Sequence, residues 1–317
     1  MLDYQYKAFN LNFKTCLPLP QLPVSQAERV DVTVNWGKID WQPANINTEH
    51  RCWHVDGDDV YFYWQFSGKY LVRGGKEIII DPLPEVDSLH IIGLPLLGPL
   101  MAMLLQQRGY FVLHGSGVKI GDRACLFLGC KGQGKSTMAA TLYGRGHKLV
   151  ADDIAAIALN STGEPTLVPG FPQIRLWPDS VTAALGHENP ETLPEIYPNV
   201  SKRACPTFDN FHARSLPLQR IYILGSAPQP TSQPLPIQAA IAHLISNSYI
   251  PMTLGQDFVN SGFSAKHLQD CTGMIKQTEV YSLDRPRDLD LLPEVARLVE
   301  EDLTREQNRL QHLEQVG

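Results

Sequence analysis

The sequence predicts an α/β fold in which an N-terminal antiparallel β-rich domain, residues 1–88, precedes a domain of mixed strands and helices, residues 89–317. Three observations support this division. Apolar and polar residues alternate through several segments before residue 85, as in half-buried strands. A glycine-rich segment near residue 130 lies between an apolar strand and a helix. Helical periodicity dominates residues 237–313.

The composition is that of a folded globular protein. Of the 317 residues, 43% are hydrophobic and 19% are charged, which excludes a disordered chain. The formal net charge of −6 argues against nucleic-acid and anionic-membrane partners, because either would need a basic surface to attract phosphate groups. The most apolar stretch, Ile91–Leu105, is interrupted by glycine and proline and is shorter than the roughly 20 residues that span a bilayer.

Localisation is inferred from the N-terminus and the cysteines. No basic segment followed by an apolar core opens the sequence, so no secretory leader is expected. The six cysteines are scattered without a Cys-x-x-Cys pair, a spacing that predicts neither a zinc site nor a disulfide framework. We therefore expect a reduced, cytoplasmic protein.

Strand-type alternation defines the N-terminal domain, and turn residues such as Gly74-Gly75 separate its segments. Its many aromatic residues are expected to pack in the core and across strands, and a peptide-binding surface is the alternative. The expected strands are Phe9–Phe13, Val30–Trp36, Val60–Phe66, Tyr70–Arg73 and Glu77–Ile80.

The second domain alternates short strands with helices. Its last helix carries an apolar stripe, which predicts docking on its own domain, with a contact in a homo-oligomer as the alternative. The Pro/Ser/Gln-rich segment Ala227–Pro236 is expected to be a loop. The expected strands are Tyr110–Leu113, Val118–Ile120, Ala124–Leu128, Lys148–Ala151, Thr166–Val168, Gln173–Leu176 and Arg220–Leu224. The expected helices are 97–108, Ser136–Arg145, Ile237–Asn247, Asp257–Lys276 and Pro293–Leu313.

The strongest motif is a phosphate-binding P-loop, Gly129-Cys130-Lys131-Gly132-Gln133-Gly134-Lys135-Ser136-Thr137. Its glycines allow the backbone N–H groups to turn inward onto phosphate oxygens, and the helix that follows adds its positive N-terminal end. The Lys135 ammonium is expected to reach the β- and γ-phosphates of ATP, and the Ser136 hydroxyl to ligate Mg²⁺. Thr137 adds a hydroxyl near the α-phosphate.

Paired carboxylates follow the strand after this loop. Asp152 and Asp153 directly follow the expected strand Lys148–Ala151. We expect this strand to lie next to the P-loop strand, so that both carboxylates lie beside the phosphates. One carboxylate there can help to hold Mg²⁺ while the other accepts a proton from an attacking hydroxyl. His114 ends another expected strand, where a structural role is the usual one for a single histidine.

The run from His114 to Asp153 closely resembles the catalytic domain of HPr kinase/phosphorylase. That family combines a strand ending in His-Gly, a loop of the form Gly-x-Ser-Gly-x-Gly-Lys-Ser, and Arg-Gly-His-x-Leu-x-Ala-Asp-Asp. The corresponding segments are Leu113–Gly115, Gly129–Ser136 and Arg145–Asp153, at matching spacings. A weaker extension through Gln173–Arg175 and on to Leu224 brings the resemblance to about a third of the chain.

The resemblance implies a P-loop kinase domain of the HPr kinase and phosphoenolpyruvate carboxykinase type, with ATP and Mg²⁺. It implies that Asp153 is the general base that deprotonates a serine hydroxyl and that His114 lies beside it. Lys135 would bind the phosphates, Ser136 would bind Mg²⁺, and Asp152 would support the metal site. From the sequence, Arg175 is a candidate contact for phosphate or substrate. For the pair Lys202-Arg203, surface charge is the favoured interpretation and a contact with phosphate or substrate is the alternative.

The sequence departs from the family at three places. Lys131 replaces a serine of the loop, Gln173 replaces a metal-binding glutamate, and the N-terminal region is not the one usual in the family. An amide is a poorer Mg²⁺ ligand than a carboxylate, which disfavours the reverse phosphorolysis. We therefore expect a kinase acting on a serine of a small protein or peptide. A small-molecule kinase, and a nucleotide-binding protein without phosphotransfer, are the alternatives.

Overall fold

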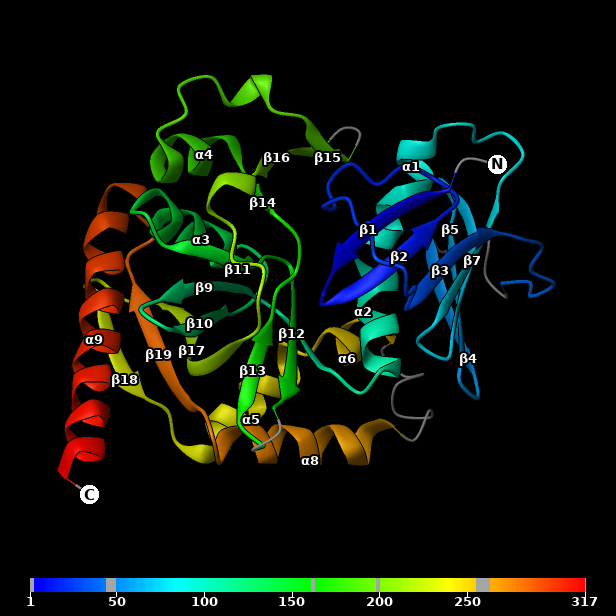
Figure 1. The fold of residues 1–317 in the computed structure, drawn as a ribbon. Coiled ribbons are helices and arrows are strands. Elements are labelled where there is room, and N and C mark those ends of the chain that lie inside the picture. Colours follow the sequence, from blue (N-terminus) through cyan, green and yellow to red (C-terminus); the bar gives the residue numbers. More distant parts are fainter. Residues whose placement is uncertain (1–2, 44–49, 161–162, 198–199, 255–262, 317) are drawn as a thin grey trace.

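A computed structural model describes residues 3–43, 50–160, 163–197, 200–254 and 263–316. It shows a mixed α/β protein with an N-terminal sheet beside a larger sheet flanked by helices (Figure 1). The α/β class predicted from the sequence is confirmed. The strands of the N-terminal sheet are β1 (Tyr4–Ala8), β2 (Leu11–Thr15), β3 (Val32–Trp36), β4 (Arg51–Asp56), β5 (Asp59–Trp64), β6 (Gly68–Arg73) and β7 (Glu77–Pro82).

The N-terminal sheet is mixed, so the prediction of an antiparallel sheet is wrong for part of it. Within the order β1-β2-β3-β7-β6-β5-β4, strand β3 runs parallel to both β2 and β7. The connection from β2 to β3 covers residues 16–31, which is long enough to return the chain for a parallel pairing. The expected first strand is also broken, because Phe9 and Asn10 turn with φ of 52° and 59° before β2 begins.

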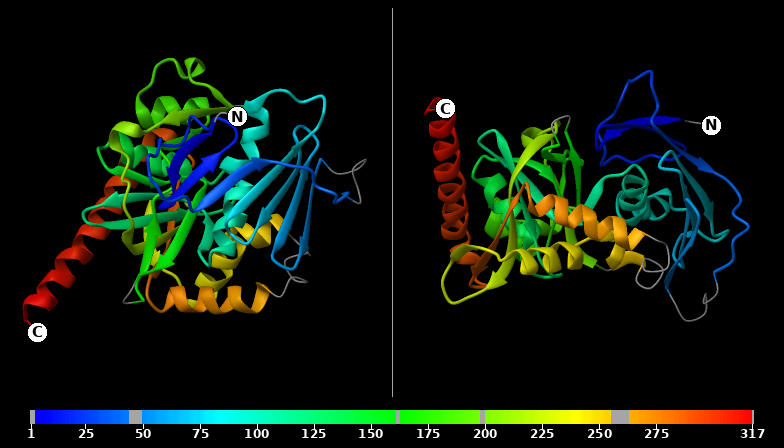
Figure 2. Two further views of the ribbon diagram at one scale, coloured as in Figure 1. Left: turned by 45° about the vertical axis from the view of Figure 1, so that its right-hand side comes forward. Right: turned by 90° about the horizontal axis from the view of Figure 1, so that it is seen from below.

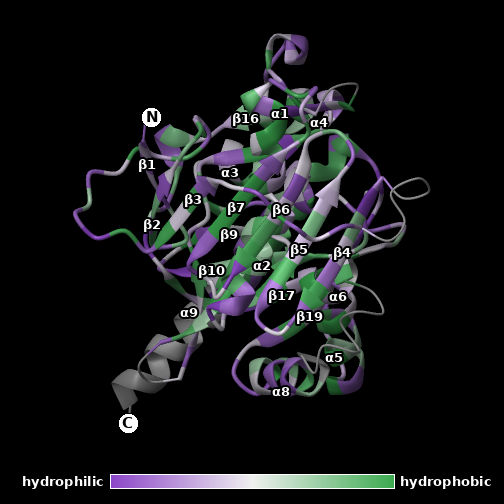
Figure 3. Ribbon diagram, turned by 90° about the vertical axis from the view of Figure 1, so that its right-hand side faces the viewer, coloured by the Kyte–Doolittle hydropathy of each residue, from purple (hydrophilic) through white to green (hydrophobic). Residues whose placement is uncertain are grey.

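The helices after β7 pack against the N-terminal sheet. They are α1 (Leu89–Gly93), the 3₁₀ turn η1 (Leu94–Leu97) and α2 (Pro99–Gln107). Leu100, Leu104 and Tyr70 belong to one apolar core that also includes Val112 and Ile154 of the larger sheet. Hydrophobic residues are frequent along α2 and the strands of the sheet that it faces (Figure 3). The boundary at residue 88 therefore stays a prediction, because apolar packing crosses it.

No single helix among the described residues is long and apolar enough to cross a membrane. The bent pair Leu89–Leu97 and Pro99–Gln107 reaches the required length and apolar character when taken together.

The larger sheet has the order β11-β9-β10-β17-β13-β12-β8 and forks at the long strand β17, whose second half also pairs with β19. Its strands are β8 (Phe111–His114), β9 (Ser116–Ile120), β10 (Arg123–Leu128), β11 (Lys148–Ala151), β12 (Ile154–Leu159), β13 (Pro165–Val168), β17 (Leu216–Ser226), β18 (Thr231–Pro234) and β19 (Glu279–Arg285). Strand β18 lies in the segment that the sequence predicts to be a loop. It is a short edge strand that pairs with β19. Its residues Thr, Ser, Gln and Pro are typical of loops, which is why the sequence does not predict a strand there.

Strand β11 is not the direct neighbour of β10, contrary to the prediction. Strand β9 lies between the two and is antiparallel to both. Consequently β10 and β11 run in the same direction, and their carboxyl ends still meet at one edge of the sheet. The inference that Asp152 and Asp153 open at the same edge as the glycine loop is therefore correct, although the strand order behind it was wrong.

Helices cover both faces of the larger sheet (Figures 1 and 2). One face carries α3 (Lys135–Gly144) and α9 (Leu292–Val316), which follows η4 (Leu289–Leu291). The other carries α5 (Ile237–Ser246) and α8 (Phe263–Ile275). Helix α6 (Tyr249–Leu254) packs near α2. Residues 257–262 of the expected helix Asp257–Lys276 lie outside the described residues.

The last helix docks on its own chain along its first half. Val295, Val299 and Leu303 are buried in the core between α9, α3 and the sheet. The carboxylate of Glu300 accepts hydrogen bonds from Arg145 at 2.8 and 2.7 Å and lies 2.9 Å from His147. The predicted docking is thus present, and a contact in an oligomer stays a prediction.

A small three-stranded sheet completes the fold beside the glycine loop. Its order is β14-β16-β15, so β14 and β15 are its edges. The elements are β14 (Gln173–Leu176), α4 (Pro178–Leu185), η2 (Pro190–Thr192), β15 (Glu195–Tyr197), β16 (Val200–Pro206) and η3 (Phe208–Asn210).

Candidate active site

The glycine loop connects the end of β10 to the start of α3. Gly129, Gly132 and Gly134 have φ values of 149°, 85° and 83°, which side chains with a Cβ rarely adopt. At Gly134 a Cβ would also lie 2.2 Å from the Arg285 guanidinium, so a larger residue there would displace the end of that side chain. The first turn of α3 leaves backbone N–H groups without intrahelical acceptors, which makes this end of the helix suited to an anion.

Lys135 and Asn247 hold the loop in place. The Lys135 ammonium donates to the carbonyls of Gly129 at 2.8 Å and Cys130 at 3.4 Å. Burial lowers the pKa of Lys135. The Asn247 side-chain oxygen accepts the Gly129 N–H at 2.9 Å, and its backbone carbonyl accepts the His114 N–H at 2.8 Å. One buried asparagine therefore positions both the loop and the strand that carries His114.

Asp153 lies in the turn between β11 and β12 with a φ of 70°, which is uncommon for a residue with a side chain. One carboxylate oxygen is 2.9 Å from the Arg175 guanidinium and the other is 3.4 Å from Nδ1 of His114. Arg175 also donates to the carbonyl of Leu97 at 2.8 Å. About 22% of the Asp153 side chain is exposed, so a substrate can reach it.

Burial and charge set the protonation of this pair. Burial alone would raise the pKa of Asp153, but the charges of Arg175 and His114, together with more distant lysines, lower it below its ordinary value. Burial also lowers the pKa of His114, and it outweighs the opposing effect of the Asp153 charge. At neutral pH the arrangement is therefore a carboxylate beside a neutral imidazole.

Asp152 is buried behind the site. Its two oxygens accept the Ser116 hydroxyl at 2.6 Å and the Arg175 backbone N–H at 2.9 Å, and only 6% of the residue is exposed. Since both oxygens are engaged, Asp152 fixes Ser116 and β14, and it does not line the adjacent cavity. Its predicted role toward a metal stays a prediction.

A cavity of about 280 Å³ opens in front of the loop and Asp153. Of the predicted loop residues, Lys131, Gly132, Gly134, Lys135, Ser136 and Thr137 line it, whereas Gly129, Cys130 and Gln133 do not. His114 and Arg175 line it too, and Gln173 does not. The structure thus brings together the predicted residues Lys135, Ser136, Asp153, His114 and Arg175.

This cavity is strongly cationic although the whole chain is acidic. Six basic side chains line it, against two carboxylates, Asp153 and Asp179. The basic residues are Lys131, Lys135, Arg175, Lys202, Arg285 and Arg287. Such an excess of positive charge in a concave site favours a ligand with several negative charges.

Arg285 and Arg287 were missed by the sequence reasoning. Arg285 ends β19, which runs parallel to β17 and, through it, to β10, so its side chain reaches the same edge as the loop. It is 7% exposed, donates to the Gln133 carbonyl at 3.0 Å, and its Nε has no hydrogen-bond partner among the described residues. The available signal was the segment Arg285-Pro286-Arg287 at the end of a short run of alternating apolar residues, but no strand was predicted at 279–285.

The pair Lys202-Arg203 separates into two roles. Lys202 lines the cationic cavity, whereas Arg203 is 9% exposed and pairs with Glu191 and with Glu195. Arg203 is therefore a structural residue of the small sheet.

The Thr137 hydroxyl, predicted to approach a phosphate, donates to the Ser180 hydroxyl at 3.2 Å.

Oxygen ligands suited to Mg²⁺ face the cavity, namely the Ser136 hydroxyl and the carboxylates of Asp153 and Asp179. The described residues contain no cluster of three or more His, Cys, Asp or Glu side chains that would hold a metal by itself. This donor set fits a magnesium ion that completes its coordination with water and phosphate oxygens, as Mg²⁺ usually does.

The sheet is mixed and carries a glycine loop and a cationic cavity at one edge. The chain is therefore an α/β protein with a site suited to a polyanionic ligand. No family model matches the chain. Among curated proteins, HPr kinase/phosphorylase of Chlorobium phaeobacteroides (strain BS1) is 44% identical over 59 residues, which are 19% of this chain and 17% of that protein. Over that segment the chain is similar to HPr kinase/phosphorylase, and the predicted resemblance is confirmed.

A solved structure, the HPr(Ser) kinase/phosphatase from Coxiella burnetii, aligns with 64% of this chain and 97% of its own chain. The TM-score is 0.32 and the sequence identity is 13%, so the resemblance rests on the curated match. That match spans less than a fifth of the curated relative.

Proposed function

We propose that this chain is an ATP-dependent kinase that transfers the γ-phosphoryl group to a serine hydroxyl of a small protein or peptide. The observation that carries the proposal is that Asp153 faces the same cationic cavity as Lys135 and Ser136. The loop predicted to bind phosphate and the candidate base line one cavity, which supports the proposal. The partial similarity to HPr kinase/phosphorylase supports the same chemistry and a P-loop kinase domain of the HPr kinase and phosphoenolpyruvate carboxykinase type.

In this proposal the loop and the surrounding cations bind the triphosphate. Backbone N–H groups of the loop and of the first turn of α3 bind phosphate oxygens, and Lys135 leaves the loop carbonyls for the β- and γ-phosphates. Arg285, which donates to the loop at the Gln133 carbonyl, supplies further positive charge to the same cavity, as do Arg287 and Lys202. Their fixed charges stabilise the anionic transition state without reorganisation.

The transfer step uses the pair formed by Asp153 and His114. The serine oxygen forms a bond to the γ-phosphorus while the bond from that phosphorus to the β–γ bridging oxygen breaks, and ADP leaves with the electron pair. Asp153 accepts the serine proton, and neutral His114 together with Arg175 orients its carboxylate. A carboxylate with a lowered pKa is a weak base, so the proton moves late, after most of the bond to the leaving group is lost.

A magnesium ion held by Ser136 and Asp179 would neutralise phosphate charge, while Asp153 would act as the base. Gln173 does not contribute to that site, because its side chain lines a second cavity. The residues described therefore support forward transfer and provide no carboxylate at position 173 for the reverse phosphorolysis.

The experiment that tests this function compares two acceptor pools. The purified chain is incubated with radiolabelled ATP and Mg²⁺, together with either a serine-peptide pool or a pool of small hydroxylated metabolites. We expect label in the peptides. Label confined to metabolites would replace the proposal with a small-molecule kinase.

Phosphate transfer by the unmodified chain separates both kinases from a nucleotide-binding protein without phosphotransfer, and Lys135→Ala tests whether the glycine loop is where the nucleotide binds. The variant should lose nucleotide binding and transfer together, because the ammonium is the predicted phosphate contact. ATP binding by the unmodified chain, without transfer to either pool, would show a binding protein.

A further inference from the structure

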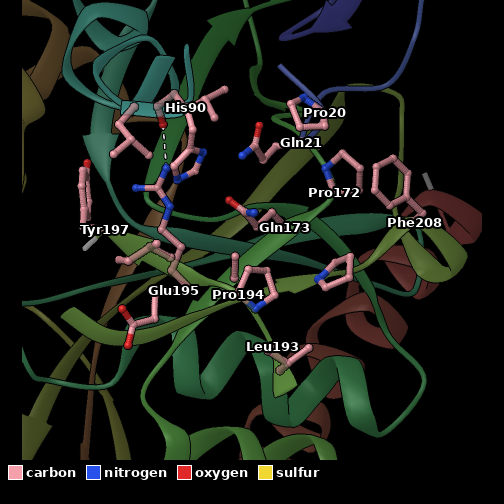
Figure 4. A pocket seen from close by; sticks show the side chains of 16 residues that line it. Pro20, Gln21, His90, Pro172, Gln173, Leu193, Pro194, Glu195, Tyr197 and Phe208 are labelled. Atoms are coloured by element: carbon pink, nitrogen blue, oxygen red, sulfur yellow. Dashed lines mark hydrogen bonds between the residues drawn. The ribbon is translucent and has the colours of Figure 1, made fainter. Parts of the chain in front are cut away.

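A second cavity, of about 260 Å³, shares Arg175 with the cationic cavity, and Figure 4 shows the side chains that line this second cavity. Arg175 lines both cavities, because its guanidinium reaches Asp153 on one side and the Leu97 carbonyl on the other. The second cavity is built from distant parts of the chain. Pro20 and Gln21 come from the N-terminal domain, and other residues come from α1, η1 and the small sheet.

The chemistry of this second cavity differs from that of the first. Eleven of its sixteen lining residues are aliphatic, proline or aromatic, and they include Phe208, which is 53% exposed. Two of its charged groups already have partners, since Arg175 pairs with Asp153 and Glu195 with Arg203. An uncharged, largely apolar ligand therefore suits this cavity, whereas the first suits a polyanion.

Two side-chain amides supply polar contacts inside the apolar walls. Gln21 and Gln173 both project into the cavity (Figure 4), and the Gln21 side-chain oxygen has no hydrogen-bond partner in the described part of the chain. The Gln21 side-chain oxygen is buried as well, and a buried polar atom left without a partner is costly. An amide can both donate and accept, which matches the N–H and C=O of a peptide group.

From these observations we propose that the second cavity binds the acceptor polypeptide beside its phosphorylated serine, with an apolar side chain among the walls and its main chain on the two amides. This inference rests on the proposed kinase function and adds the recognition of the substrate. It assigns Gln173 to substrate binding and gives the N-terminal domain, through Pro20 and Gln21, a role in specificity.

The register follows from strand β14. Gln173 and Arg175 alternate with buried neighbours and so share one face of the strand, about 7 Å apart at the strand rise per residue. An extended peptide whose serine lies at Asp153, beside Arg175, therefore places a side chain two or three residues away near Gln173. We expect selection for an apolar residue at that distance from the serine.

The test uses a serine-peptide library in which each flanking position is varied in turn, with ATP and Mg²⁺ and the full-length chain. We expect selection for Leu, Ile, Val or Phe two or three positions from the serine. Gln21→Ala and Phe208→Asp should abolish this selection and raise KM for the best peptide about tenfold, while the Kd for ADP stays unchanged. Leu159→Asp, at a residue that is 65% exposed on β12 and lines neither cavity, is the matched control.

The outcomes separate the two proposals. Transfer to peptides without positional selection, or with selection that survives both substitutions, would overturn the cavity assignment and leave the kinase function intact. Binding of ADP without transfer to any peptide would overturn the kinase function, and the cavity assignment with it.

Discussion

At the scale of single residues, Arg175 sets the charge state of the candidate base. Its guanidinium lies 2.9 Å from Asp153 and helps to lower the pKa of that carboxyl. Removing the cation while the carboxylate stays buried should raise the pKa of Asp153. Protonation would then remove the proposed base at a higher pH than in the unmodified chain.

The prediction concerns the acid limb of the rate profile. In the unmodified chain the pKa values of Asp153 and His114 both lie below their ordinary values, so kcat/KM should not change between about pH 7 and pH 8. In Arg175→Met the acid limb should move to higher pH. Arg123→Met, which removes a surface ion pair with Glu164, is the control. An acid limb that does not move would contradict the proposed coupling.

Arg285 is a buried cation that lines the cationic cavity, and its ion-pair partner is expected to be the ligand. A hydrogen bond to a charged group contributes about 1.5–3 kcal/mol, which corresponds to roughly 10-fold to 150-fold in affinity. Arg285→Met should therefore weaken ADP binding by that factor, as measured by calorimetry. Arg29→Met, at a side chain that is 86% exposed, should have no effect. Equal affinity in both variants would remove Arg285 from the nucleotide site.

At the scale of elements, Asn247 connects the end of α5 to the glycine loop and to β8. In Asn247→Ala the buried Gly129 N–H would lose its acceptor, which costs about 1–3 kcal/mol. We expect a lower free energy of unfolding in urea and weaker nucleotide binding from a loosened loop. Asn35→Ala, at an exposed position, is the control. Unchanged stability would mean that another group replaces the asparagine oxygen.

Local patterns predicted the elements that are continuous in sequence, and they predicted little about pairing between elements. The strand, glycine loop and helix around Lys135 were identifiable because each has a local signature of apolar run, glycine and helical periodicity. The position of β9 between β10 and β11 depends on pairing between distant segments, which alternation does not encode. Strand β19, with Arg285 at its end, was missed because its apolar residues are few.

In the candidate site too, local sequence patterns predicted some residues, whereas the positions of others depend on packing between distant segments. Asp153, Lys135 and Ser136 share one cavity as expected, because the carboxyl ends of parallel strands meet at one edge. The burial of Asp152, the pairing of Arg203 and the turning of Gln173 into the second cavity depend on tertiary packing. Arg145 and His147, which belong to the motif shared with HPr kinase/phosphorylase, pair with Glu300 on α9 and are structural here.

At the scale of the whole molecule, the N-terminal sheet and the second half of the chain share one apolar core. A fragment of residues 89–317 would expose Leu100, Leu104 and Phe171, and apolar burial contributes about 25 cal/mol per Å². We expect this fragment to bind a hydrophobic dye and to lose its near-ultraviolet circular dichroism. A fragment that unfolds cooperatively without dye binding would show that residues 89–317 form an independent domain.

The central claim is that Asp153 acts as the base in a cavity that also binds the nucleotide. Its most direct test is single-turnover transfer from radiolabelled ATP to a serine-peptide library, measured for the unmodified chain and for Asp153→Asn, with ADP affinity determined in parallel. General base catalysis contributes about 10²–10⁴-fold, so Asp153→Asn should bind ADP normally and transfer that much more slowly. An Asp153→Asn protein that transfers phosphate at the unmodified rate would contradict the claim.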